Sequence, residues 1–554
     1  FLLSLCSAEK EPKHLCSRGK SVERWISNSS TLSLNQSKID ISFYDISIDI
    51  NFESNTINGS VGVNGFIDNN LPEYIELDFY NNMAVNSILQ NNGQVSFLHE
   101  QNKIKIPINN IIIQGDNYFS ILIKYQGTPQ DCGAGGFKFD EHLGVDHVWT
   151  LSEAYCARSW WPSKDDPSDK ADSVYVRVTV PANPNFIVAS NGLLDSITND
   201  GDKNTFFWKE KYPITTYLVS LAIYPYTIWS EQYISSISND TMAIEHYVFP
   251  DRYESSFSNY SLTGEMISFF SGLFGEYPFI SEKYGHADFK WGGGMEHQTL
   301  SSMGSSSQNL IVHELGHSWW GNLITCKTFN DIWLNEGFAR YCQALWVEHI
   351  NGKEAYFSFM NDYAYYGDGS IYVENPSSNS QIFNSNLSYN KASWVLHMLR
   401  HKVGDDTFFE ILKSYASNDT LAYNAASTAD FQKISEDISD QNLELFFQQW
   451  IYEEGYPKYE MSWWHDGNAT YKVKIDQIQS SGLFSMPIDL NFSGSIGPLL
   501  IDTTIVVENN SLNHLYEISG LNFIVENVTL DPNNWILKEV SYTTNGIDNL
   551  LPKN

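Results

Sequence analysis

The stretch HELGHSWWGNLITCKTFNDIWLNE, from His313 to Glu336, decides which fold we expect for this chain. Two histidines four residues apart bracket a glutamate, and another glutamate stands nineteen residues after the second histidine. Residues four apart on an α-helix project from one face, so His313 and His317 can share one metal ion. Glu314 lies beside the pair and can reach a water at the metal without binding the metal itself. The spacing therefore predicts a metal site on a helix; the alternative is a partly buried helix whose histidines only form hydrogen bonds.

The third ligand decides which kind of metal site this is. Glu336 stands in WLNEGFARY, near the start of a second helical pattern. Two imidazoles and one carboxylate leave the fourth position of a tetrahedral ion open, which is typical of catalytic zinc sites. The class with a third histidine is excluded, because Leu323 occupies that position. We expect one Zn²⁺ held by His313, His317 and Glu336, although the donor types alone leave other divalent ions open.

Composition limits the class of protein. A chain of 554 residues with 42% hydrophobic and 14% aromatic residues predicts a globular protein of two to four domains. The formal net charge is -33, and no basic patch suits a phosphate backbone, so we expect no nucleic-acid partner. An acidic surface attracts cationic ligands, such as a peptide with a free ammonium group.

The first residues and the cysteines bear on localisation. No run of 18 apolar residues occurs, so we expect no membrane span. The chain opens FLLSLCSAEKEP, which resembles the end of a secretory signal; a truncated terminus without targeting meaning is the alternative. We expect an exported protein (periplasmic, cell-surface or extracellular) rather than a cytoplasmic one. In an exported protein, Cys132 with Cys156 and Cys326 with Cys342 are conceivable disulfides; otherwise these are buried thiols.

Hydrophobic periodicity divides the chain into a β, a mostly α and a second β region. IDISFYDISIDI, from Ile39 to Ile50, alternates like a half-buried strand, and similar runs continue to about Pro250. Helical spacing then dominates, with a helix N-cap expected at Ser427 or Thr428, and alternation returns after Pro457. The predicted fold class is multidomain α+β. We expect an N-terminal segment with a signal remnant (1–38), a β domain (39–250), a catalytic domain (251–456) and a C-terminal β-sandwich (457–554).

These motifs resemble those of a known family. HExxH, eighteen residues and Glu, with WWG after the second histidine and WLNEG around the glutamate, resemble the aminopeptidase N family of zinc metallopeptidases. This is peptidase family M1, a gluzincin family that also contains leukotriene hydrolase. Its upstream GxMEN motif is matched by GGMEH at Gly293–His297. The resemblance implies that Glu296 grips the free amine of the substrate. His297 replaces the usual Asn, which changes the local hydrogen bonding and leaves the glutamate in place.

Two further positions follow from the resemblance. Tyr389 in YNKA is a near match to the family's YxKG motif and would be the catalytic tyrosine. LSEAYCARSWWPSKDDPSDKAD resembles a segment of the family's N-terminal domain, in which Glu153 would help to bind the amine and Arg158 is the arginine that follows it. The alternative for Glu153 is a surface glutamate. The resemblance covers about residues 39 to 459, and its motifs occur in the family's order.

The resemblance also implies a mechanism and an architecture. Glu314 would act as general base, Tyr389 would donate to the oxyanion, and backbone amides at Gly293 and Gly294 would bind the substrate strand. Glu296 and Glu153 would hold the α-ammonium, which makes the expected enzyme an aminopeptidase that acts on peptides with a free N-terminus. A saddle-like β domain and a thermolysin-like catalytic domain are expected. Many members end in a long helical domain, whereas the residues after Pro457 read as strands, so a short bacterial-type form is expected.

Other functions remain open at this stage. A thermolysin-like endopeptidase would share the zinc helix but would not need glutamates that bind an amine. Epoxide hydrolysis, as in the leukotriene branch, is opposed by the strands after Pro457. A non-catalytic protein for peptide binding or adhesion, with a vestigial zinc site, is opposed by the presence of every expected catalytic residue type. The sequence does not indicate the preferred N-terminal residue or the oligomeric state.

Overall fold

The structure is a computed structural model and describes residues 32–132, 135–466 and 470–543. By internal compactness the chain forms two units. The first unit holds the described residues up to Phe329 together with Asn375–Phe383 and Asp419–Ala425, and the second holds the rest. This division runs through the region 251–456, so the domain boundaries from the sequence stay predictions. Within the described ranges, no helix combines the length and the hydrophobicity needed to cross a membrane.

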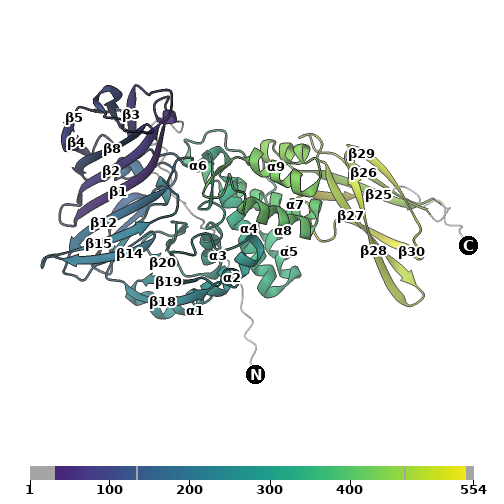
Figure 1. Ribbon diagram of the computed structural model, residues 1–554. Coiled ribbons are helices and arrows are strands. Elements are labelled where there is room, and N and C mark those ends of the chain that lie inside the picture. Colours follow the sequence, from purple (N-terminus) through teal and green to yellow (C-terminus); the bar gives the residue numbers. More distant parts are fainter. Residues whose placement is uncertain (1–31, 133–134, 467–469, 544–554) are drawn as a thin grey trace, which may run out of the picture. The chain divides into compact units, whose positions relative to one another are not determined.

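The N-terminal part of the first unit contains an eight-stranded sheet (Figure 1). In spatial order its strands are β14 (Leu193–Asn199), β15 (Lys203–Glu210), β12 (Ser173–Pro181), β1 (Ile39–Asn51), β2 (Thr56–Ile67), β8 (Tyr118–Gly127), β4 (Ala84–Gln90) and β5 (Gly93–Val95). β1 pairs in parallel with β12, and the other neighbours are antiparallel. Ile46, Ile48 and Ile50 of β1 are buried, as the alternation in the sequence predicts.

Smaller sheets complete the β part of the first unit. One contains β3 (Tyr74–Asp78), β7 (Lys103–Pro107) and β6 (Leu98–Glu100), and a second contains β13 (Ile187–Ser190), β17 (Leu221–Tyr224), β10 (Val145–Leu151) and β9 (Gly136–His142). A third contains β18 (Thr227–Ile234), β19 (Thr241–Val248), β20 (Lys283–Asp288), β22 (Ser301–Met303) and β21 (Gly294–Met295). β11 (Lys170–Ala171) pairs with β16 (Ile214–Thr215). The third sheet brings the GGMEH motif into the core of this unit.

Helices follow where the sequence has helical spacing. The first unit contains α1 (Tyr253–Tyr260), α2 (Thr263–Phe274), α3 (Gln308–Gly316) and α6 (Asn379–Ile382), with the short strand β23 (Ile324–Cys326). The second unit contains α4 (Trp333–Asn351), α5 (Lys353–Asp362), the π-helix η7 (Ser385–Lys391), α7 (Ala392–Val403), α8 (Asp405–Ala416), α9 (Thr428–Ser439), α10 (Glu444–Phe447) and the π-helix η8 (Gln448–Tyr452). Ser427 caps α9 in a capping box with Asp430, so the expected helix start is confirmed.

The second unit ends in strands. One sheet has the order β29 (Asn513–Ser519), β26 (Thr470–Gln477), β25 (Lys458–His465) and β31 (Glu539–Tyr542). The other has the order β28 (Leu499–Asn509), β27 (Met486–Ile496) and β30 (Ile524–Leu530). The predicted fold class is confirmed: a β-rich N-terminal part, a helical region and a β-rich C-terminal part.

The cysteines confirm one predicted pair and correct the other. Cys132 and Cys156 form a disulfide across a sequence separation of 24 residues. Cys326 and Cys342 are buried, and no disulfide joins them in the part of the chain that the structure describes, so the second conceivable disulfide is wrong and the alternative of buried thiols holds for this pair. Cys326 lies in β23 and Cys342 lies within α4.

Candidate active site

The two histidines of the motif converge at the end of α3. Ser307 caps the helix by accepting a hydrogen bond from the Leu310 amide. His313 lies in the last turn, and His317 is the residue after the final helical position, with φ -60° and ψ -20°. Because these angles are still helical, the one-face geometry expected from the spacing holds beyond the end of the helix. The two Nε2 atoms are 3.3 Å apart, and both side chains are buried.

The geometry of this pair fits two ligands of one ion. His317 Nδ1 lies 3.0 Å from the Trp320 carbonyl oxygen, so Nδ1–H donates there and the Nε2 lone pair is left for a metal. Two nitrogens at the Zn–N distance from a tetrahedral ion are about 3.3 Å apart. The separation of the two Nε2 atoms therefore has the value that a shared zinc ion requires.

Glu336 lies in the first turn of α4 and is fully buried. One ligand atom from each of His313, His317 and Glu336 lies within 4.8 Å of the other two. Two imidazoles and one carboxylate form a donor set that suits zinc, and the role of these three residues as its ligands stays a prediction.

Glu314 approaches the backbone of the GGMEH motif closely. Ligand atoms of Glu296, Glu314 and His317 also lie within 4.8 Å of one another. A Cβ atom added to Gly294 would overlap the Glu314 carboxylate, so only glycine permits this approach. The Gly293 carbonyl accepts a hydrogen bond from the Gly304 amide at 2.8 Å. The missing side chain of Gly294 therefore makes room for Glu314, and substrate binding at the two glycines stays a prediction.

His297 stabilises the loop after Glu296. His297 Nδ1 lies 2.9 Å from Ser302 Oγ, and burial lowers the pKa of His297 to about 3, so the ring is neutral. Asn322 Nδ2 donates to the Glu296 carbonyl oxygen at 2.8 Å. His297 is outside both groups of ligand atoms found in the described residues, whereas Glu296 Oε1 lies 4.0 Å from His317 Nδ1. His297 thus ties the loop to β22 through Ser302.

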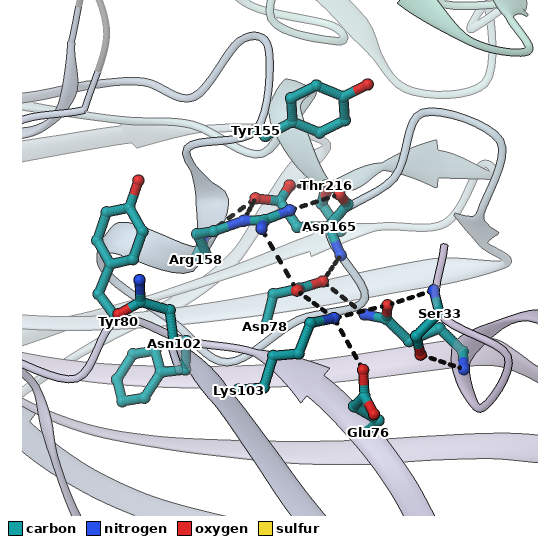
Figure 2. A network of polar contacts seen from close by, with 12 residues as sticks. Ser33, Glu76, Asp78, Tyr80, Asn102, Lys103, Tyr155, Arg158, Asp165 and Thr216 are labelled. Carbon is teal, nitrogen blue, oxygen red and sulfur yellow. Dashed lines mark hydrogen bonds and ion pairs between the residues drawn. The ribbon is translucent and has the colours of Figure 1, made fainter. Parts of the chain in front are cut away.

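Arg158 belongs to a separate buried network (Figure 2). Its Nε donates to Asp165 Oδ2 at 2.8 Å, and its guanidinium lies 3.3 Å from Asp78 Oδ1. Lys103 joins the network through Glu76 at 2.8 Å and Asp78 at 3.2 Å. Arg158 therefore holds the strand and loop segments of the β region together, and nothing in this geometry assigns it to substrate.

Glu153 and Tyr389 are both buried, and their roles stay predictions. Glu153 is fully buried in the segment that follows β10, and it is outside both groups of ligand atoms. The alternative of a surface glutamate is therefore wrong for Glu153. Tyr389 is buried in the π-helix η7 of the second unit. Single π-helical turns occur frequently at functional sites, and sequence periodicity carries no clear signal for them.

Comparison with known proteins places this geometry in a family. The model of the "Peptidase M1 N-terminal domain" matches residues 41–218, and that of the "Peptidase family M1 domain" matches residues 295–450. Together the two matches cover more than half of the chain, and they include Glu296, the HExxH motif and Tyr389.

The chain belongs to peptidase family M1.

Curated M1 relatives are similar over part of their length. "Probable aminopeptidase 2" from Sulfurisphaera tokodaii is 24% identical over 76% of this chain and 54% of that protein. Human "Aminopeptidase N" is 26% identical over 62% of this chain and 39% of that protein. The chain thus spans about half the length of the curated relatives that it matches.

Solved structures share the fold. Aminopeptidase A from Legionella pneumophila, solved with aspartic acid, superposes with a TM-score of 0.80 at 16% identity, over 93% of this chain and 60% of that chain. An M1 zinc metallopeptidase from Deinococcus radiodurans gives a TM-score of 0.66 at 24% identity, over 76% of this chain and 94% of that chain. At these identities the likeness shows the M1 fold.

Proposed function

We propose that this M1 chain is a zinc-dependent aminopeptidase that removes the N-terminal residue from peptides with a free α-amine. One observation carries the proposal: the two Nε2 atoms converge at the separation that a shared zinc ion requires, and two buried glutamates stand beside them. One glutamate precedes the helix on the GGMEH loop and the other follows the first histidine on α3. Such an arrangement supplies both a reactive centre and a negative group for an ammonium.

His313, His317 and Glu336 would hold the zinc ion. When bound, zinc polarises the scissile carbonyl and makes water a nucleophile near neutral pH. His317 is oriented for this by the Trp320 carbonyl oxygen, which fixes the tautomer and leaves Nε2 unprotonated. The D. radiodurans protein of similar fold is an M1 zinc metallopeptidase, which supports the choice of zinc.

Glu314 would move protons during hydrolysis. Its carboxylate is held next to the Gly294 backbone because position 294 has no side chain. From there it would take a proton from the attacking water and deliver it to the leaving amine. Tyr389 would donate a hydrogen bond to the oxygen on which negative charge develops.

The buried glutamates outside the zinc helix would select the N-terminal end of the peptide substrate. Glu296 and Glu153 would accept hydrogen bonds from the α-ammonium, which would place the first peptide bond at the reactive centre. Backbone groups of Gly293 and Gly294 would pair with the substrate strand. A bound ammonium would also compensate the negative charge of these buried carboxylates.

We also propose that the protein is exported. Disulfides persist in oxidising compartments and are rare in the cytosol. The Cys132–Cys156 disulfide closes a loop in the first unit, and this supports the expectation from the opening residues.

Release of p-nitroaniline from Leu- or Ala-p-nitroanilide tests the proposed activity. We expect turnover that a chelator abolishes and added zinc restores, with one zinc per chain by elemental analysis. A purified chain that binds zinc but leaves both anilides intact would contradict the catalytic assignment.

A further inference from the structure

Strand β14 forms an exposed edge of the eight-stranded sheet (Figure 1). All seven of its residues are exposed, and no other strand of the described chain pairs with its outer edge. Leu193, Leu194 and Ile197 are 42%, 40% and 51% exposed. Proteins commonly protect such edges with lysine, proline, a bulge or a covering segment. β14 contains no lysine or proline, and its protective features are one charged residue, Asp195, and a bulge at that residue. An open apolar edge of this kind can accept an extended backbone.

A β-bulge gathers the apolar side chains of β14 on one face. Leu194 is opposite Trp208 and Ile197 is opposite Phe206, whereas Asp195 is the extra residue between the two paired positions. Phe206 and Trp208 are two apart on β15 and share a face. Leu194 and Ile197 therefore share that face too, although residues three apart on a regular strand would point to opposite sides.

This face borders a cavity of about 260 Å³. Val188 of β13 and Tyr247 of β19 line its other sides, so strands of three sheets meet around it. Trp208 Nε1 donates to the Val188 carbonyl oxygen at 3.2 Å, which leaves the indole ring as apolar surface. Pockets for drug-sized ligands have volumes of roughly 300–1,000 Å³. The cavity beside β14 is smaller and fits one large apolar side chain.

Charges at the turn end of β14 favour a cationic group there, whereas Lys211 lies near Asp195 at the other end of the strand. Lys209 pairs with Asp195 at 2.8 Å, and Lys203 pairs with Asp49 at 2.6 Å. Asp200 and Asp202, in the turn between β14 and β15, have no ion pair among the described residues. These two carboxylates, on a chain of net charge -33, attract a lysine or arginine.

We propose that β14 and the cavity beside it form a docking site for an extended cationic peptide segment. The backbone of the segment pairs with the outer edge of β14, one aromatic or branched apolar side chain fills the cavity, and a neighbouring lysine or arginine meets Asp200 and Asp202. Main-chain pairing supplies affinity and the cavity supplies selectivity, as in other complexes formed by strand addition.

Hydrogen bonds connect this docking site to the loop that carries Glu296. Asn191 Nδ2 donates to the Gln298 carbonyl oxygen at 2.7 Å, and the Gly192 amide donates to Thr299 Oγ1 at 2.8 Å. Both donors immediately precede β14. A consequence for catalysis rests on the proposed function. Peptide substrates that contain such a segment bind more tightly, so their KM is lower than that of substrates without the segment, while kcat is the same.

Fluorescence anisotropy with a capped peptide tests the docking site separately from catalysis. The probe is acetyl-Lys-Val-Phe-Val-Lys-Lys-amide with tetramethylrhodamine, a dye without net charge, on the last lysine, so that two lysines stay cationic; it is added to the 554-residue chain. Its blocked N-terminus cannot supply the ammonium that Glu296 would hold. We expect saturable binding that weakens at least about tenfold in Ile197→Asp or when alanine replaces the phenylalanine of the probe, because burying a charge or losing the anchor is costly.

Ile234→Asp is the matched control, because Ile234 is 61% exposed on the edge strand β18 and does not line the cavity. It should bind the probe like the wild type, and Ile197→Asp should hydrolyse Leu-p-nitroanilide like the wild type. Equal binding by Ile197→Asp, or equal binding of the alanine probe, would overturn the proposal. A dimer in sedimentation velocity that Ile197→Asp dissociates would also overturn it, because a second copy of the chain would then occupy the edge.

Discussion

Two groups of buried carboxylates in the first unit differ in the side chains that face them. In the network of Figure 2, Arg158 faces Asp165 and Asp78, and Lys103 faces Asp78 and Glu76. At the end of α3, the atoms that converge are carboxylate oxygens and histidine nitrogens. The first group is neutralised by cations of the chain itself, which is the arrangement of a structural network. The second group presents oxygen and nitrogen atoms that can donate lone pairs, which is the arrangement of a site that binds a cation from outside the chain.

The largest expected effect comes from Glu314→Gln, which keeps the shape of the side chain and removes its basicity. We expect kcat to fall about 10³-fold or more, because no group then takes the proton from the attacking water. Zinc content should stay at one per chain, since Glu314 is not among the proposed ligands. Glu410→Gln, at an exposed position of α8, is the control and should behave like the wild type. A Glu314→Gln enzyme with wild-type kcat would remove the general-base assignment.

Sequence spacing predicted that His313 and His317 lie on one face of a helix, because the geometry of the HExxH motif is local. The distance from His313 to His317 along a helix needs no tertiary information, and the same holds for the capping box at Ser427. The close approach of Glu314 to Gly294 depends on a contact between a helix and a loop that is distant in the sequence. The GGMEH motif alone predicts that Gly294 binds substrate and does not predict its contact with Glu314. The bulge at Asp195 was also beyond sequence reasoning, because pairing register depends on the partner strand.

Arg158→Met should mainly affect stability. Removing the guanidinium leaves Asp165 and Asp78 buried with less compensation, which costs about 3–5 kcal/mol. The thermal unfolding midpoint should fall, while zinc content of the folded protein stays at one per chain. The matched control is Lys105→Met, which breaks the partly exposed pair with Glu100 and should cost under about 1 kcal/mol. Loss of zinc without loss of stability in Arg158→Met would show that the two buried groups are not separate.

The disulfide gives the next effect in size. Cys132 and Cys156 enclose the segment that leads to Glu153, and a closure over 24 residues contributes about 3 kcal/mol in the chain-entropy estimate. The double variant Cys132→Ser, Cys156→Ser should therefore unfold at a lower temperature. Dithiothreitol should lower the midpoint of the wild type and leave that of the variant unchanged. Equal sensitivity of the two proteins to the reductant would contradict this role.

Tyr389→Phe gives the smallest effect in this series. Loss of one hydroxyl donor to the oxyanion should lower kcat about 10²-fold with little change in KM. Tyr356→Phe is the matched control, because it removes another buried hydroxyl of the second unit, which lies 2.9 Å from Tyr341 Oη and 2.6 Å from His397 Nδ1. That control should lower stability and leave kcat unchanged. Equal kcat values for Tyr389→Phe and the wild type would reassign Tyr389 to packing.

The most direct test of the account compares hydrolysis of one tripeptide, such as Leu-Ala-Ala, in its free and N-acetylated forms. An enzyme whose buried glutamates hold an ammonium should cleave the first bond of the free peptide and leave the acetylated peptide intact, because acetylation removes the charge that Glu296 would bind. Glu296→Gln should reduce turnover of the free peptide. Equal rates on the two peptides would contradict the account and identify an endopeptidase instead.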